Sequence, residues 1–414
     1  LLASKVDRSQ VDQPGATGFL FCQNARYTKQ TTAGWPHVRA MRVLAGKGLA
    51  ARSSHAYIVH AGSEVIELGT VPLAPDGSFF VEVPADTAIA FQAVDAEGRS
   101  ELNEMSWIFV RPGEHRGCLG CHQTRHAAPP LPNGPVQAMT VPPVRLLGKG
   151  RPHRFRGNNA AVTGLMEMQW DRYREVASIN RHSQTVPPLA TGRDEVNQLV
   201  AELKHKDPAI RLSACQRLAI FRERLAAAAL APVLKDDDRE VRLHAAFALA
   251  ACGTRDSLPP LLAALNDSDP LVAQAAATGV ENLTGSSQPF DAFAPAERLK
   301  AQADAWAAAI ASAGWDKIEQ QLVARLADTD RDVVRRAAVA LGHVGADAAR
   351  KALRDYVARE RASNPYPEWR KGHRGDGARF NSLSPANPRT LQAAVRSLGY
   401  LEGARVGGRE GVES

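Results

Sequence analysis

The sequence predicts a multidomain protein of the β plus α class, with a small antiparallel β-sandwich, a coil-rich segment and a C-terminal α-solenoid in that order. Three observations lead to this prediction: period-two alternation over residues 36–111, a proline-rich coil over 112–194, and a repeat of Ala-rich helices over 195–414. Residues 1–35 precede them as an N-terminal extension. A chain of 414 residues, 44% of them hydrophobic, is long enough to build several compact cores.

The strands of the predicted sandwich are short blocks in which apolar and polar side chains alternate, such as 78–83 and 89–94. Period two places successive side chains on opposite faces, so such blocks form half-buried strands. Turn signals separate the blocks. Ala74–Gly77 and Asp95–Gly98 each supply an Asp that can bond its own backbone and a Gly that can adopt positive φ. These features predict antiparallel strands joined by tight turns.

The C-terminal half of the chain shows a fixed repeat. Its markers are Ile210-Arg211, Val241-Arg242, Val272-Ala273 and Val334-Arg335, which stand 31, 31 and 62 residues apart and precede Ala-rich helices. A pair of helices cannot bury its apolar face alone, so neighbouring pairs stack into an α-solenoid. The units resemble HEAT-type repeats, most clearly over Asp332–Gly342, and a last copy is predicted over Leu391–Leu401.

The composition of the chain argues against nucleic acid as a partner. A formal net charge of +7 and a pI of about 9.3 favour attraction to an acidic protein or an anionic membrane surface. The basic residues, however, are scattered and interleaved with acids, as in Asp236–Glu240, and do not form the dense stripe that binds phosphates. No run of 18 or more apolar residues occurs, so no transmembrane helix is predicted and membrane association would be peripheral.

One pentapeptide in the coil-rich segment carries a cofactor signature: Cys118-Leu119-Gly120-Cys121-His122. Two thiols at this spacing can add to the two vinyl groups of haem, while the adjacent imidazole reaches the iron from one side. The spacing therefore predicts one covalently attached haem c, with Cys118 and Cys121 as thioether positions and His122 as an axial ligand. The surrounding coil has few apolar residues, apart from one predicted helix near 163–178, and a haem would give it an apolar surface to pack on.

Two other chemistries use a pair of thiols at this spacing, namely a redox-active dithiol and half of a zinc site. Zinc needs two further ligands, for which Cys22, His115 and His126 are available. A thioredoxin-type pair is expected between a strand and a helix, whereas Pro129-Pro130 follow the motif closely. The sequence favours haem over both alternatives.

The sixth ligand of the iron is open at this stage. Met139 is the first choice, because it stands in coil 17 residues beyond His122. The other candidates are Met166, Met168, His126 and His153. An open sixth position is a further alternative.

Short motifs that lead into the pentapeptide resemble a known family. They are, in order, Gly69–Pro72, Asp76–Phe79, Val83–Ala85, Asp95–Arg99, Ser106-Trp107 and Arg111–Glu114. Their order and spacing are similar to the haem-bearing region of the hydrazine synthase alpha-subunit family. The resemblance implies a β-domain that leads directly into a c-type haem, in a periplasmic or otherwise extracytoplasmic protein. Family members often carry an upstream β-propeller and further haem motifs, whereas this sequence has one such motif and continues into helical repeats.

These features favour a monohaem c-type cytochrome subunit for electron transfer, whose repeat region binds protein partners and docks it to a larger redox complex. A first alternative is a haem enzyme subunit with an open distal site that acts on a small nitrogen or oxygen species. A second alternative is a structural assembly protein with a secondary haem. No acid–base or nucleophile constellation stands out, so no catalytic residue is predicted and an electron-transfer subunit is favoured over a self-contained enzyme.

Overall fold

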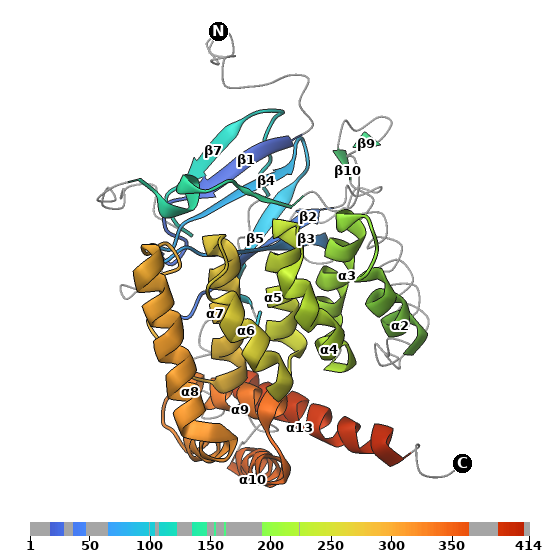
Figure 1. The fold of residues 1–414 in the computed structure, drawn as a ribbon, viewed down its shortest axis with the longest axis vertical. Helices are drawn as coiled ribbons and strands as arrows, with labels where there is room; N and C mark the ends of the chain where they lie inside the picture. Colours follow the sequence, from blue (N-terminus) through green and yellow to red (C-terminus); the bar gives the residue numbers. More distant parts are fainter. Residues whose placement is uncertain are drawn as a thin grey trace, which may run out of the picture.

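The N-terminal part of the molecule is built from β-strands and the C-terminal part from helices, as Figure 1 shows. The computed structural model describes residues 17–28, 36–46, 65–98, 100–103, 107–121, 135–146, 153–154, 161–162, 193–222, 224–363 and 388–409. In Figure 1 the β region stands above a row of helices. The predicted order, a β region followed by a helical repeat region, is therefore confirmed.

Two four-stranded sheets and one two-stranded sheet contain the strands of the described ranges. The strands are β1 (Thr17–Cys22), β2 (Ala40–Gly46), β3 (Val65–Pro72), β4 (Phe79–Pro84), β5 (Ile89–Val94), β6 (Ser100–Asn103), β7 (His115–Cys118), β8 (Val144–Arg145), β9 (His153–Arg154) and β10 (Ala161–Val162). The four-stranded sheets have the orders β7-β1-β4-β8 and β3-β2-β5-β6.

The first of these sheets corrects the prediction of a purely antiparallel domain. Strand β1 pairs in parallel with β7, and β4 pairs in parallel with β8. Strand β1 lies in the range assigned to the N-terminal extension, whereas β7 and β8 lie beyond residue 111. The β region is therefore larger than 36–111. Sequence patterns did not reveal these pairings because two to six residues carry little periodicity and parallel partners are joined only by long connections.

The two predicted turns have the expected geometry. The N–H of Gly77 donates to the carbonyl of Ala74 at 2.8 Å, and the N–H of Gly98 donates to that of Asp95 at 2.9 Å. The φ angles of the two glycines are 83° and 77°, in the region that residues with a Cβ rarely adopt. The turns between β3 and β4 and between β5 and β6 are thus set by local sequence.

Among the described residues, the helical region begins at residue 193. Its α-helices are α2 (Arg193–Glu202), α3 (Pro208–Phe221), α4 (Ala227–Leu230), α5 (Arg239–Cys252), α6 (Leu258–Ala264), α7 (Pro270–Thr284), α8 (Ala296–Arg325), α9 (Arg331–Val344), α10 (Asp347–Ser363) and α13 (Pro388–Arg409), and α8 is interrupted at Gly314. The last predicted copy, 391–401, falls inside α13. The predicted helix near 163–178 lies outside the described residues.

An aspartate caps the N-terminus of one helix in each repeat. Asp207, Asp238, Asp269 and Asp330 accept backbone N–H groups from the first turns of α3, α5, α7 and α9. These caps are 31, 31 and 61 residues apart, whereas the last two sequence markers are 62 residues apart. The marker of the last unit, Val334, therefore stands one residue farther from its cap than the markers of the earlier units do.

The phase of the repeat decides what its arginines contact. Arg211 pairs with Asp236 at 2.6 Å, and Arg242 pairs with Asp267 at 2.8 Å, each pair joining one unit to the next. Arg335 stands one position later in its helix than these arginines. It pairs instead with Asp95 of the β region, at 2.8 Å, with only 2% of its side chain exposed. The shift of one residue therefore turns a bond between repeats into a bond between the two parts of the molecule.

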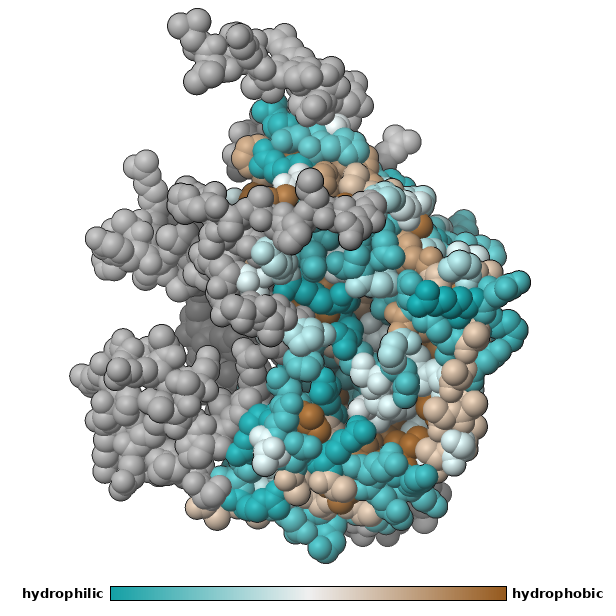
Figure 2. Space-filling view, turned by 90° about the vertical axis from the view of Figure 1, so that its left-hand side faces the viewer, coloured by the Kyte–Doolittle hydropathy of each residue, from teal (hydrophilic) through white to brown (hydrophobic). Residues whose placement is uncertain are grey.

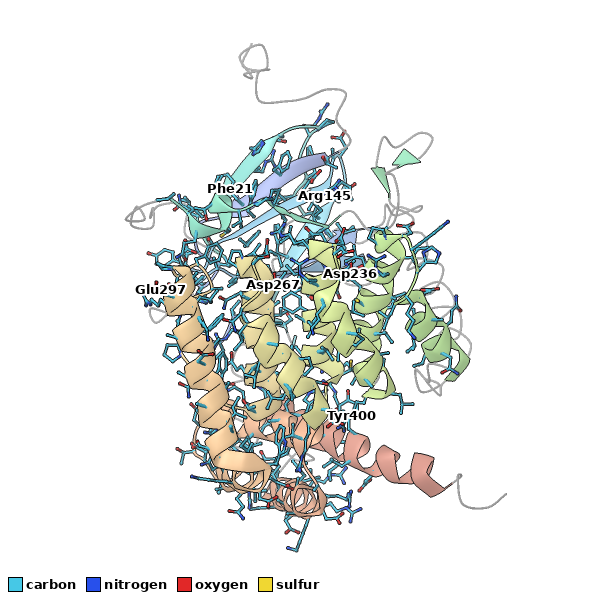
Figure 3. The ribbon with its side chains drawn as sticks, viewed as in Figure 1. Phe21, Arg145, Asp236, Asp267, Glu297 and Tyr400 are labelled. Carbon is cyan, nitrogen blue, oxygen red and sulfur yellow. The ribbon has the colours of Figure 1, made fainter. Side chains whose placement is uncertain are left out.

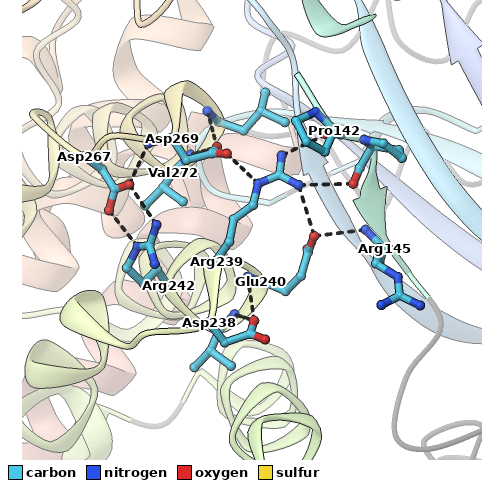
Figure 4. Close-up of polar contacts among 12 residues, drawn as sticks. Pro142, Arg145, Asp238, Arg239, Glu240, Arg242, Asp267, Asp269 and Val272 are labelled. Atoms are coloured by element: carbon cyan, nitrogen blue, oxygen red, sulfur yellow. Dashed lines mark hydrogen bonds and ion pairs between the residues drawn. The ribbon is translucent and has the colours of Figure 1, made fainter. Parts of the chain in front are cut away.

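The β region packs against the face of the repeats formed by α3, α5, α7 and α9. The side-chain amide of Gln216 on α3 donates to the carbonyl of Leu68 at 3.1 Å. Arg39 and Glu281 join the β region to α7 at 2.7 Å. Near α5, Arg239 donates to the carbonyls of Pro142 and Pro143, as the close-up in Figure 4 displays for this junction. A single buried hydrophobic cluster contains side chains from both parts.

No helix within the described ranges is long and apolar enough to cross a membrane.

We expect Arg335→Met to lower the free energy of unfolding by about 3–5 kcal/mol, because it leaves the Asp95 carboxylate buried without its cation. Thermal and urea unfolding of the whole chain measure this. Lys351→Met is the matched control, since Lys351 and Asp355 are both largely exposed and should contribute less than about 1 kcal/mol. Equal losses in the two variants would contradict the importance of the buried pair.

A second expectation concerns acid sensitivity. Burial lowers the pKa of His343 from 6.5 to about 4, and its Nδ1 bonds the carbonyl of Gly253 at 2.9 Å. Between these pH values His343 is protonated in the unfolded chain and neutral in the folded chain. The unfolding free energy should therefore be constant above about pH 6.5 and fall by about 3 kcal/mol for this histidine as the pH drops toward 4. His343→Gln should flatten the measured slope, and an unchanged slope would refute the assignment.

Candidate haem-attachment site

The first cysteine of the pentapeptide ends strand β7, which pairs in parallel with β1. In this pairing Cys118 lies opposite Cys22, the last residue of β1. The carbonyl of Cys118 accepts the N–H of Gln23 at 3.0 Å, so the pairing continues past the strand end. The first cysteine of the motif is therefore held in place by the sheet.

The two faces of this strand pair carry different side chains. On one face, His115 stacks on Phe19 with ring centroids 4.4 Å apart, and Gly117 leaves room for the ring of Phe21, which is labelled in Figure 3. Side chains alternate between faces along a strand, so Cys22 and Cys118 lie on the other face. Cys22 is buried in the main hydrophobic cluster, against which the partly buried Cys118 packs.

The second cysteine is fixed through the loop that follows β1. The N–H of Cys121 donates to the carbonyl of Tyr27 at 3.0 Å, and its side chain is buried. Among the described residues, neither Cys118 nor Cys121 forms a disulfide. His122, the predicted axial ligand, is the first residue of a range, 122–134, that lies outside the described residues.

Cys22 is a third thiol beside the motif, which sequence reasoning had left as a possible zinc ligand. Burial raises the pKa of Cys22 well above its usual value, and the nearby Cys121 and Cys118 raise it further. The thiol therefore stays protonated near neutral pH and is a weak nucleophile and ligand. Spacing along the chain gave no sign of this proximity, because 96 residues separate Cys22 from Cys118.

The zinc alternative gains no support from the described residues. His115 lies on the opposite face from the thiols, stacked on Phe19, and His126 is outside the described ranges. Within those ranges, no group of three or more His, Cys, Asp or Glu side chains is arranged to hold a metal ion.

Met139 lies in a short 3-10 helix, η3 (Gln137–Thr140), and its side chain is exposed. Hydrogen bonds join η3 to the turn before β4: Asp76 accepts the N–H of Gln137, and Ser78 accepts that of Ala138. In the same turn, the carbonyl of Gly77 accepts the N–H of Ala25. Ala25 lies in the loop after β1, which also contacts Cys121. Met139 is thus attached to the same loop system as the motif.

The other ligand candidates cannot be placed. Met166, Met168 and His126 lie outside the described residues, and for His153 only the backbone strand β9 is described.

Three large apolar side chains of the motif and of the segments bonded to it are exposed. Tyr27, Leu119 and Met139 are large apolar side chains exposed to 36%, 44% and 42%. They belong to the motif itself or to the segments bonded to it.

Cys215 and Cys252, the two cysteines of the repeats, are fully buried in α3 and α5. Burial raises the pKa of the Cys215 thiol. Both residues act as small core side chains.

Comparison with known proteins identifies two regions. Residues 36–123 match the family profile described as hydrazine synthase alpha subunit middle domain, and residues 227–313 match that of HEAT repeats. The chain thus combines a domain similar to that middle domain with HEAT-type repeats. No curated protein gives a match to the chain.

Similar solved structures fall into the same two groups. One is hydrazine synthase from Kuenenia stuttgartiensis, with 17% identity and a TM-score of 0.25, over 37% of this chain and 24% of that chain. A chain of the phycocyanin lyase CpcE–CpcF complex from a Nostoc species has 20% identity and a TM-score of 0.24, over 53% and 99% of the two chains. A designed armadillo repeat protein in complex with a peptide has 15% identity and a TM-score of 0.21, over 56% and 94%.

The thiols should differ in reactivity in the folded, haem-free protein. We expect iodoacetamide at pH 8 to modify Cys118 first and Cys22 last among the three thiols of the site, because burial keeps Cys22 protonated. Peptide mass spectrometry after timed quenching measures the order. Labelling in urea is the control, in which all five cysteines should react. Early modification of Cys22 in the folded protein would contradict its buried position.

Proposed function

We propose that this protein is a monohaem c-type cytochrome subunit for electron transfer, located in the periplasm or elsewhere outside the cytoplasm. The observation that carries the proposal is the pentapeptide Cys118–His122, whose first thiol ends a paired strand and whose second is fixed by the loop after β1. The match of residues 36–123 to the hydrazine synthase alpha-subunit middle domain supports it.

The chain's own residues would hold the cofactor in three ways. Cys118 and Cys121 would form the thioether bonds, and His122 would bind the iron on one side. The exposed apolar side chains of Tyr27, Leu119 and Met139 would lose contact with water against the macrocycle. A haem in this position supplies one-electron redox chemistry, and the low exposure of Cys121 keeps one edge of the site away from solvent.

The repeat region would serve as the docking surface for a larger redox complex. Of its surfaces, the face formed by α3, α5, α7 and α9 is already covered by the β region, through contacts such as Gln216 with Leu68 and Arg335 with Asp95. A partner would therefore contact the outer helices, among them α8 and α10. Figure 2 looks onto the side of the molecule that carries α8 and shows mainly hydrophilic residues with separate small hydrophobic areas. Such a surface suits a polar and reversible contact.

A haem enzyme subunit with an open distal site is the second candidate. The specific observation in its favour is the match to the middle domain of hydrazine synthase, which is itself an enzyme subunit by its name. The exposed side chain of Met139 is also compatible with an iron that lacks a strong sixth ligand. The third candidate is a structural assembly protein with a secondary haem, which the helical repeat region favours.

We expect the purified holoprotein to retain haem after acid–acetone extraction and to give the pyridine haemochrome spectrum of a c-type haem. The double variant Cys118→Ala, Cys121→Ala should lose the covalent haem. Cys215→Ala, a fully buried cysteine far from the motif in sequence, is the matched control and should keep it. A wild-type protein without covalent haem would refute the proposed function.

Carbon monoxide separates the candidates that remain. A reduced spectrum that carbon monoxide does not change means that a strong sixth ligand is present, which supports electron transfer. A spectrum that shifts at once means that the distal position is open, which favours the enzyme.

A further inference from the structure

A cavity with a volume of about 570 Å³ lies between the β region and the repeats. Arg26 and Arg39 line it from the β region, whereas Glu281 on α7 and Arg298 and Trp306 on α8 line it from the helices. Pockets for small molecules and cofactors commonly have volumes of roughly 300–1,000 Å³ and lie between domains. The cavity therefore has the size and position of a ligand site.

This cavity adjoins the candidate attachment site. Arg26 directly precedes Tyr27, whose carbonyl accepts the N–H of Cys121 at 3.0 Å. Cys22 and Cys118 lie on the inner face of the sheet, and Cys22 begins the loop that carries Arg26. A haem bound through Cys118 and Cys121 is held at its vinyl edge. The carboxylate edge lies opposite the vinyl edge and must extend away from the thiols. Arg26, the residue before Tyr27, lines the cavity.

The charges on the cavity wall favour an anion. Arg39 is neutralised by Glu281, with two hydrogen bonds of 2.7 and 3.0 Å. Among the described residues, Arg26 donates to the carbonyls of Val38 and Pro75 and forms no ion pair. Arg298 is exposed and likewise has no carboxylate partner within the described ranges. Asp291 is the other acid on the wall, so positive charge remains in excess.

The wall also contains polar atoms without partners. Trp306 is 4% exposed, and its indole nitrogen Nε1 has no hydrogen-bond partner among the described residues. The side-chain oxygen of Gln274, on the same wall, also lacks one there. A buried donor without an acceptor costs about 1–3 kcal/mol, so a bound acceptor near Trp306 would stabilise the structure.

We propose that this cavity receives the propionate edge of the haem, with Arg26 and Arg298 facing the two propionates and Trp306 donating its N–H to one of them. This inference rests on the proposed function and adds to it the residues that set the charge around the cofactor. Arg26 and Arg298 would raise the reduction potential, because a nearby cation favours the reduced iron.

The test compares the holoproteins of Arg26→Gln, Arg298→Gln and Trp306→Phe with the wild type by redox titration. Removal of either guanidinium should lower the ratio of reduced to oxidised haem about tenfold at a fixed solution potential, which corresponds to about 59 mV for one electron. Arg26→Lys keeps the charge and should restore the ratio to within about threefold. Lys300→Gln on the same helix is the control, because Lys300 is exposed and pairs with Asp304.

The outcomes separate the two proposals. Covalent haem with a lowered potential in the arginine variants supports both. Covalent haem whose potential is the same in Arg298→Gln, Trp306→Phe and the wild type overturns the propionate assignment and leaves the cytochrome in place. Arg298 is exposed, so its variant should fold even if Arg26→Gln does not. Saturable, Arg298-dependent binding of free succinate by the holoprotein would show a site for a separate carboxylate and would also overturn the assignment. A wild type without covalent haem removes both proposals.

Discussion

The close packing of strand β3 on helices α3 and α5 is the constraint on which the rest of the structure depends. At Gly69 a Cβ atom would come within 2.9 Å of Gln216 and 3.1 Å of His244, so the backbone of the strand lies directly on the two helices. The sheet and the helices share one main buried cluster. Because packed interiors deform little, this contact fixes where β3 and the sheet that contains it lie on the helices.

Charge plays a different role here from the one that the composition suggested. A net charge of +7 predicted attraction to an acidic partner or surface. In the structure, several arginines act inside the molecule: Arg335 on Asp95, Arg39 on Glu281, and Arg239 on the segment before β8. Such contacts orient the β region on the repeats more than they stabilise it, since the desolvation of a buried charge offsets much of its attraction. The basic composition therefore reflects assembly within the chain as well as any external partner.

The candidate site was predictable in part. The spacing of Cys118, Cys121 and His122 identified the attachment chemistry, because that chemistry needs neighbours along the chain. The third thiol, the inner face on which the thiols lie and the adjoining cavity were not predictable. Each depends on a pairing between residues about 90 or more positions apart, such as Cys22 with Cys118, and no local pattern encodes such a pairing.

The sequence by itself determined the local features of this protein. It specified the glycine turns after Ala74 and Asp95, the 31-residue repeat and the order of β and helical regions, because turn and helix preferences act over a few residues. Only the tertiary structure decided that β1 and β7 pair in parallel, that one face of the repeats is covered, and that Arg335 bonds Asp95. These contacts close long loops, and the entropy lost in closing them is recovered only by the burial that the complete fold provides.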